Sequence, residues 1–302
     1  MVASAGAPTG SQEVPAAGSR GFPDARGAPV ANGAPGGSGA LGVLGVGALA
    51  SALVLALHRA RSGTTFHLSP RSAGAVATLQ TQVQAVAHGS NQQVADACQM
   101  LIIGVRPAQL QALADEVQFH AGHHLMVLSA GTPLADLQRL FAPARVTRLM
   151  TGLAVSEGRS AISCFPPDAR VHSLWQPACA AVIAFEKEAQ FEASVLAVCA
   201  NAWWLDQLAV MSQWLVDNTG MAPAQAQTLL AANMADVAQM LTLNPNKSPA
   251  EIARFIGSPG TFTGAGLDHL QSAKAHQPWL VALALVGDRM VQGGSKVLAS
   301  GE

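Results

Sequence analysis

The chain has 302 residues, of which half are apolar and 12% are charged, and its formal net charge is −1. This composition predicts a globular protein with a large buried interior, and the lack of a basic block argues against a nucleic-acid partner. The four cysteines lie far apart and form no C-x-x-C pair, so we expect neither a disulfide framework nor a metal site. Reduced core thiols in a cytoplasmic protein fit this spacing.

Residues 1–38 are rich in Ala, Gly, Pro and Ser and contain almost no large apolar side chains. Such a segment cannot bury enough apolar surface to offset the entropy lost on ordering, so the sequence predicts a disordered tail. A secretory signal is not indicated, because no basic segment is followed by an apolar one. Arg20 and Arg26, with few acidic residues around them, leave a transit peptide as an alternative.

A glycine-rich turn follows a short apolar run at residues 41–44, and a helix with apolar residues from Leu49 to Leu57 is expected after it. Gly45, Gly47 and Ala50 occupy the three small positions of the G-x-G-x-x-G/A dinucleotide fingerprint. The first glycine permits the tight turn, the second lets a pyrophosphate approach the backbone, and the alanine lets helix and strand pack closely. The start of the helix offers unpaired N–H groups to the phosphates.

An alternative for this stretch is a membrane-spanning helix, because residues 39–57 carry no charge. A second β-type run at residues 64–68 follows after a short basic connection. A dinucleotide-binding unit requires this strand–helix–strand order, whereas a membrane anchor does not. The pattern therefore favours a parallel sheet and no membrane partner.

The second strand ends in Ser69-Pro70-Arg71-Ser72. In folds specific for NAD, an Asp or Glu near this position binds the ribose 2′-hydroxyl, and here the acid is missing. Ser69 can donate a hydrogen bond to a 2′-phosphate and Arg71 can add a charge, so NADP(H) is the expected cofactor. The alternative is an ordinary solvated turn.

The rest of the first half alternates between strand and helix patterns. Strands are expected at residues 83–87, 100–105, 125–129, 145–150 and 160–164, and helices at residues 91–97 and 108–117. Asn91 is the expected N-cap of the first of these helices. His120, His123 and His124 lie in a polar connection with no acid or cysteine at ligand spacing, so a solvated loop is favoured over a zinc site.

From about residue 186 onward the strand signals stop. A long apolar helix is expected at residues 191–218, closed by Gly220, and Pro223 opens the next. A capping box at Ser248 begins a third helix, residues 258–267 predict a loop of hydroxyls and glycines, and the last helix is expected at residues 278–291. Helices this apolar bury a face against each other or against a second subunit, so a homodimer or a higher homo-oligomer is predicted.

Between residues 41 and 291 the sequence resembles pyrroline-5-carboxylate reductase. The resemblance is carried by five motifs: Gly42 to Ala50, Gly104-Val105-Arg106-Pro107, Ser129-Ala130-Gly131, Arg148-Leu149-Met150, and Ser258-Pro259-Gly260 with Thr263 and Gly266-Leu267. It implies an α/β Rossmann N-terminal domain, with a mostly parallel, doubly wound sheet, followed by an all-α dimerisation domain. The corresponding boundaries are a tail at 1–38, an NADP-binding domain at 39–185, a helical dimerisation and substrate domain at 186–295, and a C-terminal tail at 296–302.

The same resemblance implies site residues. NADP(H) is expected to contact Gly45, Gly47, Ala48, Leu49, Ala50, Ser69, Arg71, Asn91, Val105, Arg106, Pro107, Ala130 and Gly131. The substrate carboxylate is expected at Ser258, Gly260, Thr261 and Thr263, with Thr263 as the expected catalytic residue. No metal is implied.

The substrate motifs depart from the family pattern. The family's Met-Pro-Asn-Thr-Pro is Met150-Thr151-Gly152-Leu153 here, its Ser-Gly-Ser-Gly-Pro-Ala-Tyr is roughly residues 198–204, and an acid before its His-Pro pair is replaced by Asn246. The predicted function is NADPH-dependent reduction of a small cyclic imine, pyrroline-5-carboxylate to proline. Reduction of another imine or keto compound is an alternative, and so is a Rossmann binding or regulatory protein that has lost catalysis.

Overall fold

The computed structural model describes the backbone of residues 39–299 and the side chains of residues 39–292. The tail predicted at residues 1–38 lies outside the described residues, and so do residues 300–302 of the predicted C-terminal tail. The boundary predicted between residues 185 and 186 stays a prediction.

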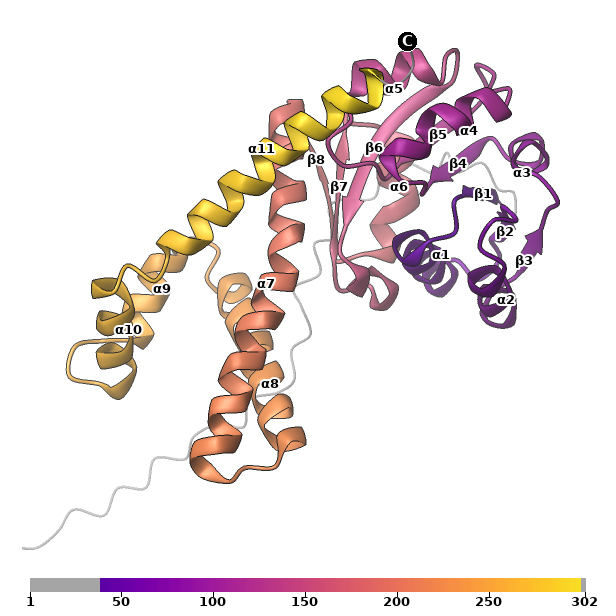
Figure 1. Ribbon diagram of the computed structural model, residues 1–302. Helices are drawn as coiled ribbons and strands as arrows, with labels where there is room; N and C mark the ends of the chain where they lie inside the picture. Colours follow the sequence, from indigo (N-terminus) through magenta and orange to yellow (C-terminus); the bar gives the residue numbers. More distant parts are fainter. Residues whose placement is uncertain (1–38, 300–302) are drawn as a thin grey trace, which may run out of the picture. The chain divides into compact units, whose positions relative to one another are not determined.

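Within the described residues, eight strands form one sheet in the order β3-β2-β1-β4-β5-β6-β7-β8 (Figure 1). The strands are β1 (Ala40–Leu44), β2 (Thr65–Leu68), β3 (Ala85–Ala87), β4 (Met100–Ile103), β5 (His124–Val127), β6 (Arg145–Thr151), β7 (Ala161–Phe165) and β8 (Ala181–Ala184). Only the β6–β7 pair is antiparallel in this sheet. The strand order reverses between β1 and β4, and in open α/β sheets a ligand crevice forms at the carboxyl ends of the strands at such a point. The predicted doubly wound α/β domain is confirmed.

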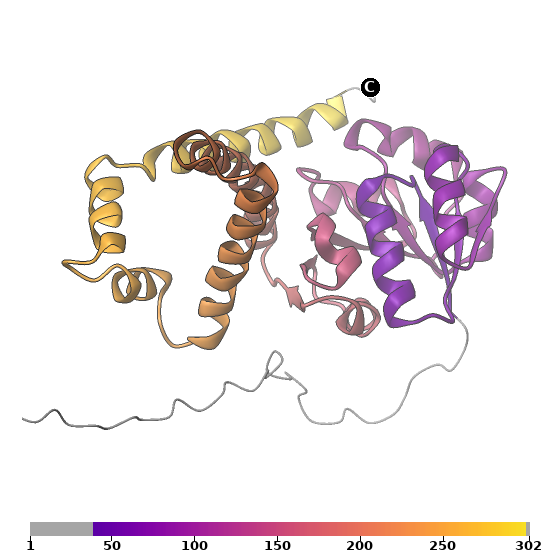
Figure 2. The same cartoon turned by 90° about the horizontal axis from the view of Figure 1, so that it is seen from below.

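Helices cover both faces of the sheet (Figure 2). They are α1 (Ala48–Ala60), α2 (Ala73–Gln82), α3 (Asn91–Ala97), α4 (Leu110–Glu116), α5 (Leu134–Leu140) and α6 (Ala169–Trp175), with short 3-10 turns η1 (Pro107–Gln109), η2 (Leu153–Glu157) and η3 (Gln176–Ala178). One buried cluster holds Leu53, Phe66 and Trp175, and the other holds Leu110 and Phe141. Two separate apolar clusters explain why the central strands are apolar on both sides.

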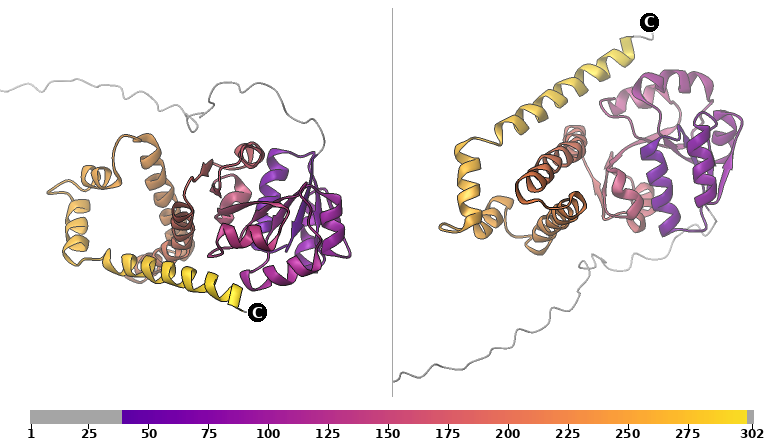
Figure 3. Two further views of the ribbon diagram at one scale, coloured as in Figure 1. Left: turned by 90° about the horizontal axis from the view of Figure 1, so that it is seen from above. Right: turned by 60° about the horizontal axis from the view of Figure 1, so that its bottom comes forward.

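The second half is helical, as predicted. It consists of α7 (Glu188–Thr219), α8 (Pro223–Leu243), α9 (Pro249–Ile256), α10 (Phe262–Ser272) and α11 (Gln277–Ala299). α7 and α8 lie side by side as a hairpin (Figure 3), joined at Gly220, whose φ of 68° suits glycine. Large apolar side chains on these helices are exposed, including Trp214, Phe255 and the fully exposed Phe262. An apolar surface of this extent is typical of a subunit interface.

Several local predictions were wrong. Ser90, not Asn91, is the N-cap of α3, because its hydroxyl accepts a hydrogen bond from the Gln93 amide. The expected loop at residues 258–267 already contains the start of α10 at Phe262, and α11 continues through residues 296–299, where a tail was expected. Helices α2, α5 and α6 and strand β8 were not predicted.

The histidine-rich connection before β5 also differs from the prediction of a solvated loop. His123 and His124 are buried, and burial lowers the pKa of both side chains. The ring of His124 lies 2.8 Å from the Thr147 hydroxyl, and Nε2 of His123 lies 3.0 Å from the Ala95 carbonyl. His123 has a partner at both ring nitrogens, since its Nδ1 accepts from the His120 amide, whereas Nδ1 of the buried His124 has none. The membrane alternative for residues 39–57 also fails, because the stretch is divided between strand β1 and the largely buried helix α1.

Candidate active site

The glycine turn after β1 is built so that only small residues fit. Gly45 has φ of 89°, and a Cβ atom there would lie 2.7 Å from the backbone nitrogen of Val105. A Cβ at Gly104 would lie 2.4 Å from the Gly45 carbonyl oxygen and 3.0 Å from the Ala50 methyl. The ends of β1 and β4 and the start of α1 therefore approach each other more closely than side chains would allow.

Gly47 differs from Gly45, since nothing lies within 4 Å of the position that its Cβ would take. It is the exposed N-cap of α1, no side chain caps the helix, and no acidic residue lies in its first turn. The N–H groups of the first turn therefore have no side-chain cap, and the space beside Gly47 is open at the positive end of the helix dipole. An open space above a glycine at an uncapped helix start fits a pyrophosphate, so the turn suits a dinucleotide.

Three predicted cofactor residues lie at the ends of β2 and β3. Ser69 is buried, and its Oγ accepts a hydrogen bond of 3.0 Å from the Gly45 amide, which ties the end of β2 to the turn. Arg71 is half exposed, and its Nη2 donates to Oε2 of Glu116 at 2.9 Å. Nδ2 of Asn91 donates to the same oxygen, also at 2.9 Å. The sequence analysis did not identify Glu116, because no local pattern indicates that the end of α4 contacts Arg71 and Asn91.

The predicted residues after β4 lie on the other side of the turn. Val105 touches the Gly45 position, the exposed Arg106 precedes η1, and Pro107 opens that 3-10 turn. The structure therefore gathers these first-half residues around the carboxyl ends of β1, β2 and β4. Their contacts with a cofactor stay predictions.

An apolar cluster adjoins the turn through Leu49. Leu49 and Ala130, both predicted cofactor residues, pack with Met150 of β6, Val198 of α7 and Met290 of α11. Helices of the second half therefore form part of this wall. An apolar wall excludes water, as hydride transfer requires.

Gly131 has a packing role. Its φ is 68°, and a Cβ atom there would lie 2.7 Å from the Met290 carbonyl oxygen, so the backbone of α11 rests on this turn. This close approach explains the glycine without a cofactor.

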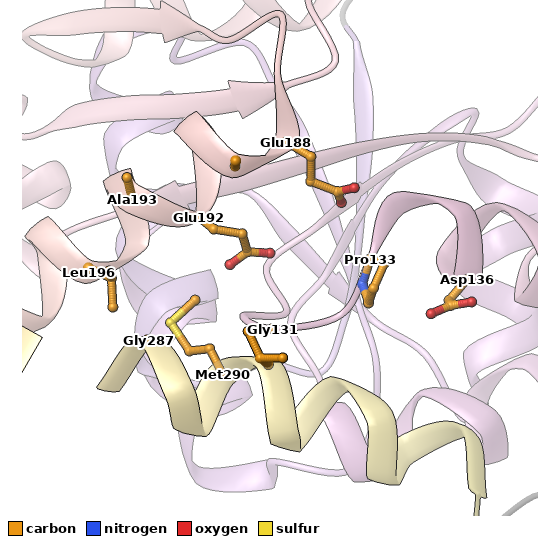
Figure 4. A pocket seen from close by; sticks show the side chains of 11 residues that line it. Gly131, Pro133, Asp136, Glu188, Glu192, Ala193, Leu196, Gly287 and Met290 are labelled. Atoms are coloured by element: carbon orange, nitrogen blue, oxygen red, sulfur yellow. The ribbon is translucent and has the colours of Figure 1, made fainter. Parts of the chain in front are cut away.

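A cavity of about 630 Å³ opens beside Gly131, between α5, α7 and α11 (Figure 4). It is lined by Gly131, Pro133, Asp136, Glu188, Ala189, Glu192, Ala193, Leu196, Gly287, Met290 and Val291. The carboxylates of Glu188 and Glu192 extend from α7 into this space (Figure 4). Its lining is thus apolar with a few carboxylates.

Arg148 forms ion pairs with both Glu188 and Glu192. The side chain is fully buried, with Nη1 at 2.7 Å from Glu188 and Nη2 at 2.6 Å from Glu192. The guanidinium also lies 4.6 Å from the centre of the Phe191 ring. This ion-pair network joins β6 to the first turns of α7. Two carboxylates share one guanidinium, so the group has an excess of negative charge.

The predicted substrate loop is a helix cap in this structure. Oγ1 of Thr261 accepts a hydrogen bond of 2.9 Å from the Gly264 amide and donates one of 2.7 Å to the Ser258 carbonyl. Gly260 has φ of 84°, and Thr263 is exposed in the first turn of α10. α10 packs on α9, and α9 packs on α8 (Figure 2). α11 begins at Gln277, shortly after α10, and its Met290 meets Gly131. These two residues of α11 are about 20 Å apart along the helix. The predicted substrate loop is therefore separated from Gly131 by most of the length of α11.

Two of the three segments that depart from the family pattern, residues 150–153 and residues 198–204, meet in space. A Cβ atom on Gly152 would lie 3.1 Å from Nδ2 of Asn201, so the turn after β6 contacts α7 at this point. Met150 and Val198, from the same two segments, pack in the apolar cluster beside the turn. The changes therefore belong to one site.

Comparison with protein families gives two matches. Residues 188–286 match the family model described as pyrroline-5-carboxylate reductase dimerisation, and residues 40–133 match that described as NADP oxidoreductase coenzyme F420-dependent. No curated protein matches the sequence.

Solved structures resemble the chain at low sequence identity. A pyrroline-5-carboxylate reductase from Coxiella burnetii is 17% identical with a TM-score of 0.72, covering 85% of this chain and 99% of its own. The Plasmodium falciparum pyrroline carboxylate reductase, solved with NADP bound, is 15% identical with a TM-score of 0.73, covering 84% and 97%. A reductive aminase from Aspergillus terreus, solved with NADPH and ethyl levulinate, is 18% identical with a TM-score of 0.55, covering 87% and 99%. At these identities the likeness shows the fold.

Proposed function

We propose that this chain, which belongs to the pyrroline-5-carboxylate reductase family, reduces C=N bonds with NADPH and that its first candidate substrate is 1-pyrroline-5-carboxylate. One observation carries the proposal. The open, uncapped helix start at Gly47 adjoins an apolar wall to which α7 and α11 of the dimerisation domain contribute Val198 and Met290. A nucleotide on the turn would place its reactive end against that wall.

The reaction requires little acid–base catalysis from side chains. NADPH supplies a hydride when bound, and a protonated cyclic imine is already electrophilic. The chain's own groups bind and orient: the first turn of α1 holds the pyrophosphate, Arg71 holds the 2′-phosphate, and Leu49, Ala130 and Met150 exclude water.

A second copy of the chain would complete the substrate site. In one chain the Thr261 cap forms its hydrogen bonds within its own loop, and the helices that carry it expose large apolar side chains. Pairing of two helical halves would cover these side chains and bring the loop of one chain to the cofactor of the other. We therefore include a homodimer or a higher homo-oligomer in the proposal.

The apolar helix α7 fits this assembly better than a membrane. By length and composition, α7 alone among the described helices could cross one, with a mean hydropathy of 1.2 in its best window. Its first turns carry Glu188 and Glu192, which are paired with Arg148, and α7 begins the matched dimerisation region. A partner chain thus accounts for its exposed apolar surface. The free cysteines among the described residues are consistent with the reducing cytoplasm that we propose as its location.

A different imine is the second candidate substrate, and two observations favour it. Gly152 and Asn201, which replace family substrate motifs, contact each other beside the apolar wall. The adjoining cavity also has an excess of negative charge, which suits an amine or iminium cation better than a carboxylate. A keto substrate and a catalytically inactive binding protein are the remaining alternatives.

One assay separates these functions. Purified protein is mixed with NADPH and, in turn, pyrroline-5-carboxylate, a cyclic imine of equal ring size without the carboxylate, and the matching keto acid. We expect oxidation of NADPH with the first compound. Faster turnover of the imine without a carboxylate would select the second candidate. NADPH binding without turnover of any compound would contradict reductase activity and select the binding protein.

A further inference from the structure

Glu116 lies between two residues of the cofactor crevice and binds both of them through one oxygen. Its Oε2 accepts hydrogen bonds of 2.9 Å from Nη2 of Arg71 and from Nδ2 of Asn91. Arg71 follows β2, Asn91 begins α3, and Glu116 ends α4, so the carboxylate connects three separate segments. Neither the glycine fingerprint nor the family resemblance includes this residue.

The cluster lies where the ribose of a dinucleotide would be. Ser69 accepts a hydrogen bond from the Gly45 amide, and the ends of β1 and β2 are paired at Val43 and Leu68. A pyrophosphate on the turn places its adenosine ribose at the end of β2, next to Arg71. A carboxylate there accepts from a 2′-hydroxyl but repels a 2′-phosphate.

The Arg71–Glu116 ion pair is weak enough to open. The two side chains are 52% and 36% exposed, and pairs this accessible to water contribute little to stability. A 2′-phosphate, with close to two negative charges and three acceptor oxygens, competes well for the same guanidinium. A 2′-phosphate therefore competes with Glu116 for the guanidinium of Arg71, whereas NADH makes no such demand.

We propose that Glu116 is a specificity-determining residue that limits the preference of this enzyme for NADPH over NADH. Its carboxylate holds Arg71 in the cofactor-free chain and opposes the 2′-phosphate. The inference rests on the proposed use of NADP(H) and adds to it the residue that sets how strongly the two cofactors are distinguished.

The test is Glu116→Gln, with binding of NADPH and NADH measured by isothermal titration calorimetry. The amide keeps an oxygen for Asn91 but removes the charge. We expect NADPH to bind about two- to fivefold more tightly, which is the loss of one exposed ion pair, and NADH affinity to stay the same or fall. Asp115→Asn is the matched control, because it removes the same charge from the adjacent, exposed position, where the carboxylate bonds only to Gln111.

A double-mutant cycle tests whether Glu116 affects NADPH binding through Arg71. In the Arg71→Ala background, Glu116→Gln should give a smaller gain in NADPH affinity, because no guanidinium remains to be released. Unchanged NADPH affinity in Glu116→Gln, with an unchanged melting temperature, overturns the inference while the proposed cofactor stands. Equal gains in both backgrounds, or in Asp115→Asn, also overturn it, because the effect would then be general charge. A wild-type protein that binds neither nucleotide overturns the proposed function and this inference together.

Discussion

Replacing Gly47 by alanine should weaken cofactor binding without harming the fold. The backbone there has φ −99° and ψ −178°, an extended conformation that alanine adopts freely, and nothing lies within 4 Å of the new methyl group. The loss of chain entropy in the unfolded state stabilises by about 0.4–1 kcal/mol. Alanine is a poorer N-cap than glycine, which costs roughly the same. The two effects offset each other, so the free energy of unfolding should change little.

The cofactor-bound state is affected differently. The methyl group enters the space that a pyrophosphate would occupy above the start of α1. Overpacking of this kind costs about 1–3 kcal/mol, which weakens NADPH binding about 5- to 150-fold. NADH should lose the same factor, because the two cofactors share the pyrophosphate.

Two other glycines make the test specific. Gly45→Ala forces a side chain into φ of 89° and 2.7 Å from the Val105 nitrogen, so it should lower the melting temperature as well as binding. Gly63→Ala lies in a turn at the far end of α1 with open space around it, so it should change neither. Melting by differential scanning fluorimetry and nucleotide titration give both readouts. A Gly47→Ala protein that binds NADPH like the wild type would refute the placement of the pyrophosphate.

Four further predictions concern the helical half and the core. Replacing both Glu188 and Glu192 by glutamine should lower the free energy of unfolding by about 3–5 kcal/mol in denaturant, because the buried guanidinium of Arg148 loses its charged partners. Arg148→Met should cost less, since the partly exposed carboxylates can be hydrated. Thr261→Ala should cost about 1 kcal/mol of stability as a lost cap, whereas Thr263→Ala should raise KM for a carboxylate-bearing imine at an unchanged melting temperature. Light scattering at micromolar concentration should show a dimer or a multiple of it, and a monodisperse monomer would contradict the interface. Burial lowers the pKa of His124 below its usual 6.5, so at acidic pH the unfolded chain binds more protons than the folded chain. The free energy of unfolding should therefore fall as the pH drops below 6.5. His124→Gln should flatten this dependence.

Local signals in the sequence predicted the elements that surround the nucleotide turn. The apolar runs of β1, β4 and β5 and the small residues at positions 45, 47 and 50 each form a pattern within a few residues of sequence, and the structure places them as expected. The capping box at Ser248 was predicted for the same reason, because both partners lie within one turn.

Elements defined by short or tertiary signals were missed. β8 is no shorter than β4 or β5, but it is an edge strand that gains its stability from pairing with β7 alone. α6 did carry a signal, since Asp168 caps it by accepting from the amides of Arg170 and Val171, but its seven residues show little apolar repeat. Glu116 could not be found from sequence, because its position beside Arg71 exists only once α4 has packed.

The substrate half is less predictable than the cofactor half for a physical reason. A pyrophosphate is bound by backbone N–H groups and by space, so its site depends on small residues close together in sequence. The proposed substrate side instead combines Met150 of β6 and Gly152 just after it with Val198 and Asn201 of α7, so a change on one side alters what fits the other. Because these departures face each other, they are better understood as one altered contact than as two unrelated losses. The altered contact adjoins the apolar cluster that includes Leu49, beside an open helix start, which supports the proposed reductase over a protein that has lost catalysis.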